Sequence, residues 1–136
     1  MTVRRVDQGM AAAAAEILQP VEPELRTRYL QLPVMVRTAG LAATYAYLVA
    51  KSDATPLGRA YEAVADGIRS YLVDRGRLLP GVTQNDQVVP ALAGLSAADY
   101  ARASVEVESL AGWLRRLAEA TQRANEPKPV RGPRQP

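Results

Sequence analysis

The chain has 136 residues, a formal net charge of +3 at pH 7, no cysteine and no histidine. Without cysteine it has neither a disulfide framework nor a thiolate metal site, and without histidine it lacks the commonest general base and metal ligand. No apolar stretch approaches the roughly 20 residues of a membrane span, so we expect a cytoplasmic protein that makes no membrane contact.

Arginine dominates the basic residues and accounts for 15 of the 17. Its planar guanidinium suits phosphate and carboxylate groups and stacks on bases, but a GC-rich genome explains the same bias. The residues after 125 hold Lys128, Arg131 and Arg134 against Glu126, a net charge of +2. The preceding 125 residues are therefore close to neutral, and net charge alone does not identify a nucleic-acid-binding protein.

The first predicted helix covers residues 3–19. Its apolar face comprises Val3, Val6, Met10, Ala13 and Ile17. The second helix is predicted to begin near Glu24, and Pro33 is expected to kink or divide it because proline removes an intrahelical donor. Gly40 is the predicted joint with a third helix, Leu41 to Lys51.

A fourth predicted helix starts at Thr55 and Pro56, an N-cap followed by a first-turn proline. It runs to about Arg75, and Gly76 is predicted to cap its C-terminal end. Residues 77–95 contain two prolines and two glycines and show no sustained period. They are predicted to form an irregular loop, and loops of that length are usually functional or mobile.

The fifth predicted helix opens at Ser96, with Asp99 approximating a capping box, and extends to about Arg123. Its core stripe comprises Tyr100, Ser104, Val107, Ala111, Leu114, Ala118 and Thr121, widened by Leu110 and Leu117. The proline-rich residues 126–136 are predicted to be a disordered basic tail. No strand pattern is present. The sequence therefore predicts an all-α fold, a compact bundle of about five helices in a single helical domain, residues 1–125.

The sequence gives little support for catalysis or cofactor binding. Glu62 and Asp66 share a helical face, but Arg59 and Arg69 beside them favour a solvated, salt-bridged surface over a metal site. No phosphate-binding loop of the G-x-x-x-x-G-K type occurs. We therefore expect no enzymatic activity, no metal and no cofactor, and a binding role becomes the default.

One candidate binding pattern is a DNA-binding helix-turn-helix centred on Gly40. Its recognition helix, residues 43–51, offers few polar side chains: Thr44, Tyr45, Tyr47 and Lys51. Base edges are usually read by Arg, Asn or Gln, so this pattern lacks the side chains that its function requires.

Two blocks of sequence carry a resemblance to a known family. The first comprises Tyr29, Leu32-Pro33, Val36 to Leu41 and Thr44 to Lys51. The second comprises Asp99-Tyr100, Glu106 to Leu110 and Gly112 to Ala120. Over residues 3–124 the chain resembles the small helical subunit family of the Cmr-type (type III-B) CRISPR-associated RNA-guided effector complex. It departs from that family at Ala39, where asparagine is frequent, and at Tyr47, where phenylalanine is frequent.

This resemblance implies a non-catalytic, all-helical subunit of an antiviral ribonucleoprotein. Members of that family stack in several copies and line the channel that holds the guide–target duplex, while RNA cleavage belongs to other subunits. The implied partners are guide RNA, target RNA, the other subunits of the effector complex and copies of the chain itself. The alternative is a structural helical adaptor whose arginines dock acidic partner proteins.

Seven residues are candidates for contacts with the RNA backbone: Arg26, Arg37, Thr44, Tyr47, Lys51, Arg116 and Arg123. The two arginines of the second helix share a flank if that helix stays continuous through Pro33. The three residues of the third helix share another flank and offer a hydroxyl, a stacking ring and a cation. For the two arginines of the last helix, intrahelical salt bridges to Glu119 are the competing explanation.

Overall fold

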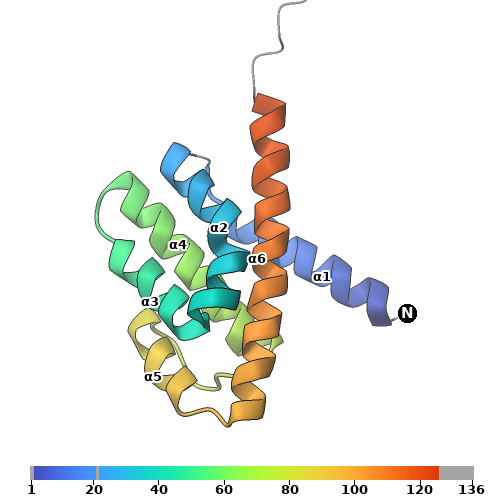
Figure 1. The fold of residues 1–136 in the computed structure, drawn as a ribbon, viewed down its shortest axis with the longest axis vertical. Coiled ribbons are helices and arrows are strands. Elements are labelled where there is room, and N and C mark those ends of the chain that lie inside the picture. Colours follow the sequence, from blue (N-terminus) through green and yellow to red (C-terminus); the bar gives the residue numbers. More distant parts are fainter. Residues whose placement is uncertain (1, 21, 126–136) are drawn as a thin grey trace, which may run out of the picture.

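The computed structural model describes the backbone of residues 2–20 and 22–125, and the side chains of residues 8–20 and 22–121. Within these ranges the chain is helical and contains no strand, so the predicted all-α fold is confirmed (Figure 1). The described part of the chain contains six α-helices: α1 (Thr2–Ile17), α2 (Pro23–Ala39), α3 (Leu41–Lys51), α4 (Pro56–Ser70), α5 (Val88–Ala93) and α6 (Ala97–Asn125). None of them is long and apolar enough to cross a membrane.

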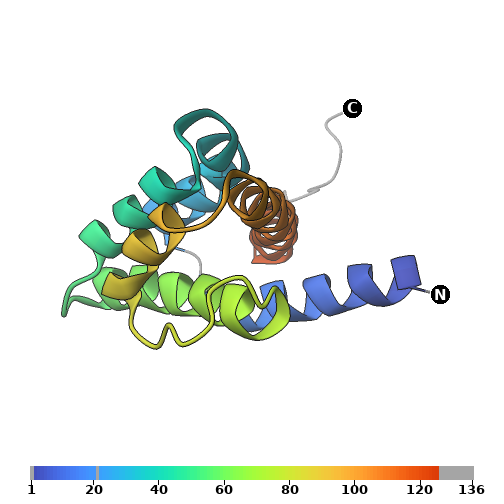
Figure 2. The ribbon, with the colours of Figure 1, turned by 90° about the horizontal axis from the view of Figure 1, so that it is seen from below.

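The helices lie on two sides of one buried core (Figure 2). In that view α1 and α4 follow one side of the molecule, and α2, α3 and the long α6 lie toward the other. The core runs between them from Met10 on α1 to Ala118 on α6. Its largest fully buried side chains are Tyr29, Tyr45, Tyr61, Leu25, Leu32, Leu41, Leu48, Leu72, Leu79, Leu92, Leu110 and Leu114.

Gly40 is the joint between α2 and α3, as predicted. Its φ of 100° is a conformation that residues with a Cβ rarely adopt. The amide of Gly40 donates to the carbonyl of Met35 at 3.2 Å, and its own carbonyl accepts from the amide of Thr44 at 3.0 Å. The Tyr100 hydroxyl of α6 accepts from the amide of Ala42 at 3.1 Å. Hydrogen bonds to α2, to α3 and to α6 therefore stabilise the backbone conformation at this joint.

Pro33 does not divide the second helix, because α2 continues through it as a single α-helix. A proline removes one intrahelical hydrogen bond, and its ring crowds the carbonyl four residues earlier. Tyr29, Leu32 and Val36 are buried on both sides of this point. Their packing against the core holds the two halves of the helix together.

The start of α4 is as predicted, with the Thr55 hydroxyl accepting from the amide of Gly58 at 3.0 Å. Helical structure continues to Arg75, as predicted, but its last part, Tyr71–Arg75, is a π-helical turn. The amide of Gly76 donates to the carbonyl of Tyr71, five residues back, at 3.0 Å. Gly76 is the C-cap, as predicted, and the left-handed conformation, φ 52°, falls on the next residue, Arg77.

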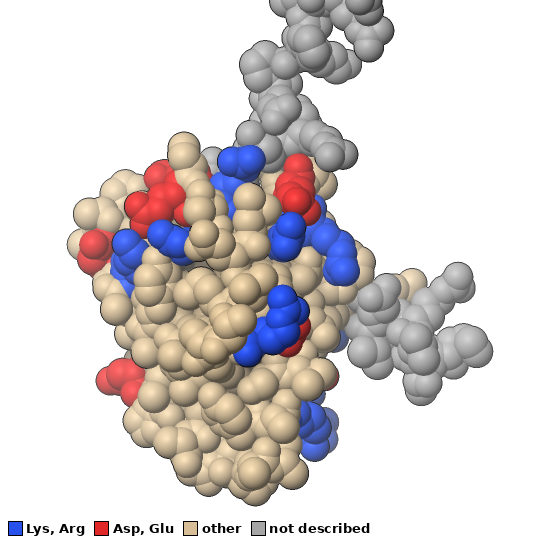
Figure 3. Space-filling model, viewed as in Figure 1, with Lys and Arg blue, Asp and Glu red and all other residues tan. Residues whose placement is uncertain are grey.

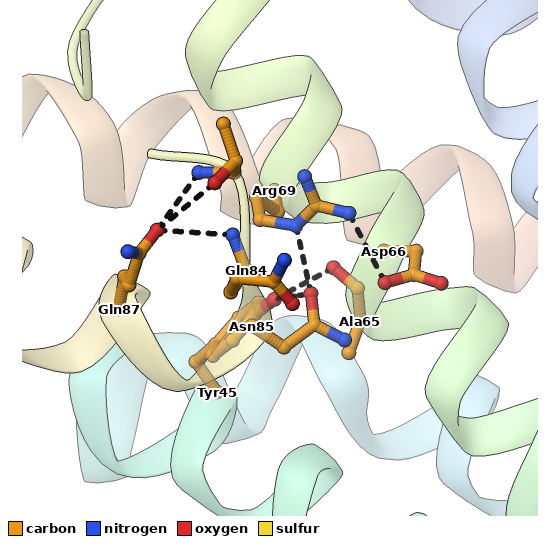
Figure 4. A network of polar contacts seen from close by, with 8 residues as sticks. Tyr45, Ala65, Asp66, Arg69, Gln84, Asn85 and Gln87 are labelled. Atoms are coloured by element: carbon orange, nitrogen blue, oxygen red, sulfur yellow. Dashed lines mark hydrogen bonds and ion pairs between the residues drawn. The ribbon is translucent and has the colours of Figure 1, made fainter. Parts of the chain in front are cut away.

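Residues 77–95 are not irregular throughout, contrary to the prediction, because they contain a 3₁₀ turn, Asn85–Gln87, and the short helix α5. The Gln87 side-chain oxygen accepts from the amides of Thr83 and Gln84 at 2.9 and 3.0 Å and so caps this segment (Figure 4). Pro90 is the third residue of α5. First-turn amides have no intrahelical acceptor, so proline is tolerated there.

Asn85 fastens the same segment to the core (Figure 4). Its side-chain oxygen accepts from the Arg69 Nε at 2.8 Å and lies 2.9 Å from the hydroxyl of Tyr45. The Tyr45 hydroxyl is also 2.8 Å from the carbonyl oxygen of Ala65. Burial raises the pKa of Tyr45, so this hydroxyl keeps its proton and donates it within the network.

The last helix, α6, begins where the sequence predicts. The Ser96 hydroxyl accepts from the amide of Asp99 at 3.1 Å, which identifies Ser96 as the N-cap. Its buried residues are Ala103, Val107, Leu110, Ala111, Leu114 and Ala118. Ala103 is absent from the predicted stripe, whereas Tyr100, Ser104, Leu117 and Thr121 are only half-buried. The predicted disordered tail, residues 126–136, lies outside the described residues.

Candidate nucleic-acid interface

Arg37 joins α2 to α6 on the surface of the molecule. Its Nη1 donates to the Oε2 of Glu108 at 3.0 Å, although 71 residues separate the two in sequence. The Arg37 side chain remains 59% exposed in this ion pair. Exposed pairs of this kind contribute little to stability. Arg37 therefore offers a guanidinium that an incoming phosphate can reach.

Arg26 lies on the same flank of α2 as Arg37, because the helix is continuous and eleven residues are close to three full turns. The rise per residue places the two about 16 Å apart along the helix axis. Arg26 is half-buried, and within the described side chains its guanidinium has no hydrogen bond or ion pair. The predicted common flank of these two arginines is therefore present.

Arg116 lies on α6, whose extensive contacts with α2 place the two helices side by side, running in opposite directions (Figure 1). Its guanidinium covers the ring of Trp113, with 5.4 Å from Cζ to the ring centroid. Glu119 pairs with Arg115, at 3.9 Å, and not with Arg116. Among the described side chains, the salt bridge proposed as the competing explanation for Arg116 is therefore absent, and the arginine is held by a cation–π contact instead.

Arg123 belongs to the last turns of α6, but its side chain lies outside the described residues. It remains a sequence-based candidate. Arg26, Arg37 and Arg116 together are hereafter called the arginine edge.

Thr44 does not belong to an exposed flank, and this part of the prediction is wrong. Its side chain is 2% exposed, and its hydroxyl donates to the carbonyl of Gly40 at 2.8 Å. The reason is the number of neighbours, since α3 packs against α2, α4, α5 and α6. Helical periodicity assigned Thr44 to a solvated side that the tertiary structure covers.

Tyr47 and Lys51 do share a flank of α3, and both belong to a cluster with α2 and α4. The Lys51 ammonium lies 3.2 Å from the Oε2 of Glu24, and 5.9 Å from the ring centroids of both Tyr47 and Tyr61. The Tyr61 hydroxyl donates to the same Glu24 oxygen at 3.1 Å. The hydrogen bonds from Lys51 and then Tyr61 lower the pKa of Glu24 below its usual 4.5. These contacts stabilise the helix packing and engage part of the Lys51 charge.

Arg28 is not among the predicted site residues, yet it completes this cluster. Its guanidinium lies 5.4 Å from the ring centroid of Tyr47, on the same ring that Lys51 approaches. Its Nη1 donates to Gln31 at 2.6 Å, while its buried Nε has no partner within the described residues. The i,i+4 spacing of Glu24 and Arg28 is the sequence signal that relates Arg28 to this cluster.

Figure 3 shows the face formed by α2, α3 and α6. Basic side chains gather over the upper parts of these helices, with acidic side chains among them, whereas the surface over α5 is nearly uncharged. Within the described part of the chain, no three Asp, Glu, His or Cys residues form a group suited to a metal ion. The chemistry available on this face is thus charge pairing and stacking.

Comparison with known proteins agrees with this architecture. The sequence profile of the family described as "CRISPR-associated protein (Cas_Cmr5)" matches residues 5–121. A crystal structure of a CRISPR-associated Cmr5 family protein from Thermus thermophilus is similar, with a TM-score of 0.57 and 25% sequence identity, covering 83% of this chain and 89% of that one. No curated protein sequence matches the chain. The predicted resemblance to the Cmr-type small-subunit family is confirmed, and the chain belongs to the Cmr5 family of CRISPR-associated proteins.

Proposed function

We propose that the chain is a non-catalytic small subunit of a type III-B CRISPR ribonucleoprotein, and that its arginine edge contacts the backbone of guide or target RNA. The observation that carries the RNA contact is Arg37. It stays 59% exposed beside Glu108 and shares its flank with Arg26. Family membership supports the assignment to the complex.

The side chains of this edge suit phosphate binding without reading of bases. Arginine binds phosphate oxygens through its planar fork, and such contacts position a protein without carrying sequence information. Recognition of sequence by pairing between guide and target would make base readout by this subunit unnecessary. Several copies arrayed on one RNA would add their weak contacts through a raised effective concentration.

The expected affinity of one copy is low and depends on salt. Two or three phosphate contacts to single-stranded RNA give a slope of about −0.7 per contact in log K against log salt. Affinity should therefore fall roughly tenfold between about 50 and 200 mM salt. Lys51 and Tyr47 are secondary candidates, because Glu24 already pairs with the Lys51 ammonium.

The test is native co-purification of the chain, followed by measurement of RNA retention by the assembled complex. A short processed guide RNA and several other protein subunits should co-purify with it. An Arg26→Ala, Arg37→Ala and Arg116→Ala triple variant should lower RNA retention at about 200 mM salt, where weak phosphate contacts are already reduced, and a Lys51→Ala variant should lower it less. Unchanged retention in the triple variant would remove the arginine edge as the contact.

The second candidate function is a structural adaptor that docks acidic proteins. Its supporting observation is the Arg37–Glu108 pair, which shows that this arginine accepts a carboxylate partner. Co-purification with protein partners alone, and no RNA, would favour the adaptor. A cytoplasmic location fits both candidates.

A further inference from the structure

We propose that a second surface, on the side of the molecule that carries α1 and α4, docks a positively charged segment of a neighbouring protein subunit. This inference rests on the proposed function, because it assigns a protein partner within the same effector complex. It also divides the molecule into an RNA-facing side and a protein-facing side.

The surface is a groove of about 420 Å³ between the C-terminal half of α1 and the end of α4 with its π-helical turn. Its apolar lining residues are Ala13, Ile17, Ala63 and Gly67. Carboxylates line it from three positions: Glu16, Asp66 and Asp74. We call it the acidic groove. A lining that combines apolar residues with carboxylates suits the aliphatic stem and charged head of lysine or arginine.

Two local features shape the acidic groove. Gly67 allows α4 to approach α1 so closely that a Cβ at this position would collide with the side chain of Ile17. The π-helical turn then carries Tyr71, Asp74 and Arg75 into the lining. Its extra residue per turn rotates these side chains relative to a regular α-helix.

The charge of the acidic groove is only partly neutralised from within the molecule. Asp66 pairs with Arg69 at 3.2 Å, but Glu16 and Asp74 have no ion pair or hydrogen bond among the described side chains. Arg75, a cation of the lining, lies against Gly9 of α1. Among the described side chains, the lining thus holds three carboxylates and one arginine, although the whole chain has a formal charge of +3.

The position and the charge of the acidic groove together indicate which kind of partner it binds. Figure 2 places α1 and α4 on the side of the molecule away from α2 and α3. RNA is not the expected occupant of the acidic groove, because its phosphates and the carboxylates of the groove repel each other. In the proposed function the arginine edge of each copy is engaged with RNA and is not available to a neighbouring copy. A lysine- or arginine-bearing segment of a different subunit is the occupant that complements this charge.

Photo-crosslinking in the assembled complex tests the assignment. Benzoylphenylalanine is introduced at Ala63 in the acidic groove and, as a control, at Val105, which is 63% exposed on α6. Crosslinks from position 63, but not from position 105, to a lysine- or arginine-rich segment of another subunit would support the proposal. Crosslinks to RNA, to a second copy or to the chain's own residues 126–136, or none at all, would overturn it.

Charge removal gives an independent readout. A Glu16→Gln, Asp74→Asn variant should be lost from the complex at salt concentrations that leave the wild type bound, with retention on the order of three- to tenfold weaker. The matched control is Glu62→Gln with Asp86→Asn, which removes two exposed carboxylates outside the groove. Equal retention of the two variants would contradict the proposal.

These experiments separate this inference from the proposed function. Suppose that the chain enters the complex and that RNA retention depends on the arginine edge, but that the crosslink from position 63 is missing. This result would contradict only the proposed role of the acidic groove. If the chain does not enter the complex, both proposals fall together.

Discussion

Arg37 on α2 and Glu108 on α6 form an ion pair of 3.0 Å at the surface that we propose for RNA contact. The pair connects two helices, and it also sets up a competition. A phosphate that approaches Arg37 must replace or share the carboxylate of Glu108. If RNA binds at Arg37 as we propose, Glu108 would weaken that binding while it orients the guanidinium.

Removal of this competitor should strengthen RNA binding. A Glu108→Gln variant is expected to bind a short unstructured RNA about 1.4- to fivefold more tightly, because an exposed ion pair of roughly 0.2–1 kcal/mol no longer has to be broken. Fluorescence anisotropy at constant salt measures the change. Glu62→Gln removes the same charge from a different helix and corrects for the general effect of net charge. Equal effects of the two variants would argue against the Arg37 contact.

Trp113 provides a built-in reporter of the arginine edge, since it is the single tryptophan of the chain. Arg116 covers its ring at 5.4 Å. If RNA phosphate binds Arg116, the guanidinium should shift and the tryptophan emission should change on titration with RNA. In Arg116→Ala the emission of the free protein should shift to longer wavelength, because the ring becomes more exposed. The RNA-dependent change should shrink in this variant, and a change of wild-type size would contradict the contact.

Asn85 should matter for stability far more than its neighbour Asp86. Asn85→Ala leaves the buried Tyr45 hydroxyl and the Arg69 Nε without this acceptor, so we expect a loss of about 1–3 kcal/mol in the free energy of unfolding. Asp86→Ala changes an exposed side chain that has no hydrogen bond among the described side chains, and should stay within about 0.5 kcal/mol. Urea unfolding followed by circular dichroism compares the two. Equal losses in the free energy of unfolding would show that the hydrogen bonds of Asn85 do not stabilise the packing of this segment on the core.

Substitution of alanine at two helical glycines should change the stability of the protein in opposite directions. Gly67→Ala places a methyl group against Ile17, and overpacking of about 1–3 kcal/mol should outweigh the gain in helix propensity. At Gly112 the nearest neighbour of an added Cβ would be Arg116 Nη1, at an ordinary 3.7 Å. Gly112→Ala should therefore stabilise the protein by up to about 1 kcal/mol. Thermal unfolding of both variants gives the signs, and a stabilising Gly67→Ala would mean that α1 is free to move away from α4.

The Glu24 cluster predicts a pH dependence. Hydrogen bonds from Lys51 and then Tyr61 lower the folded-state pKa of Glu24 below 4.5. A lowered folded-state pKa means that the charged carboxylate stabilises the protein above the unfolded-state pKa. That stabilisation is lost as the pH falls through the folded-state pKa. Glu24→Gln should therefore be less stable than wild type near neutral pH and equally stable in acid. A difference in urea midpoints that persists unchanged as the pH falls through the folded-state pKa of Glu24 would contradict this account.

Local sequence signals were sufficient for most helix boundaries. Helix α3 has its predicted bounds, Leu41–Lys51, because Gly40 permits a backbone conformation that other residues avoid. Thr55 and Ser96 cap the helices that follow them, since their hydroxyls accept backbone amides only a few residues away. Short-range interactions of this kind depend on neighbours in sequence and can be predicted from it.

Contacts between distant segments required the tertiary structure. The periodicity of α3 shows which residues share a flank, but not that α2, α4, α5 and α6 surround the helix and bury Thr44. The six residues of α5 are too few for a periodic signal, and long-range bonds from Asn85 to Tyr45 and Arg69 help to hold that segment. The Arg37–Glu108 pair and the acidic groove likewise join segments far apart in the chain.

The sequence by itself thus determined the helical class, most helix ends, the family resemblance and the choice of arginine as the candidate RNA-binding side chain. Only the tertiary structure decided which of these side chains remain exposed, which carboxylates accompany them and where a groove opens. The physical reason is that burial and ion pairing depend on which helices lie side by side, and hydrophobic patterning fixes the inward face of a helix without specifying its neighbours.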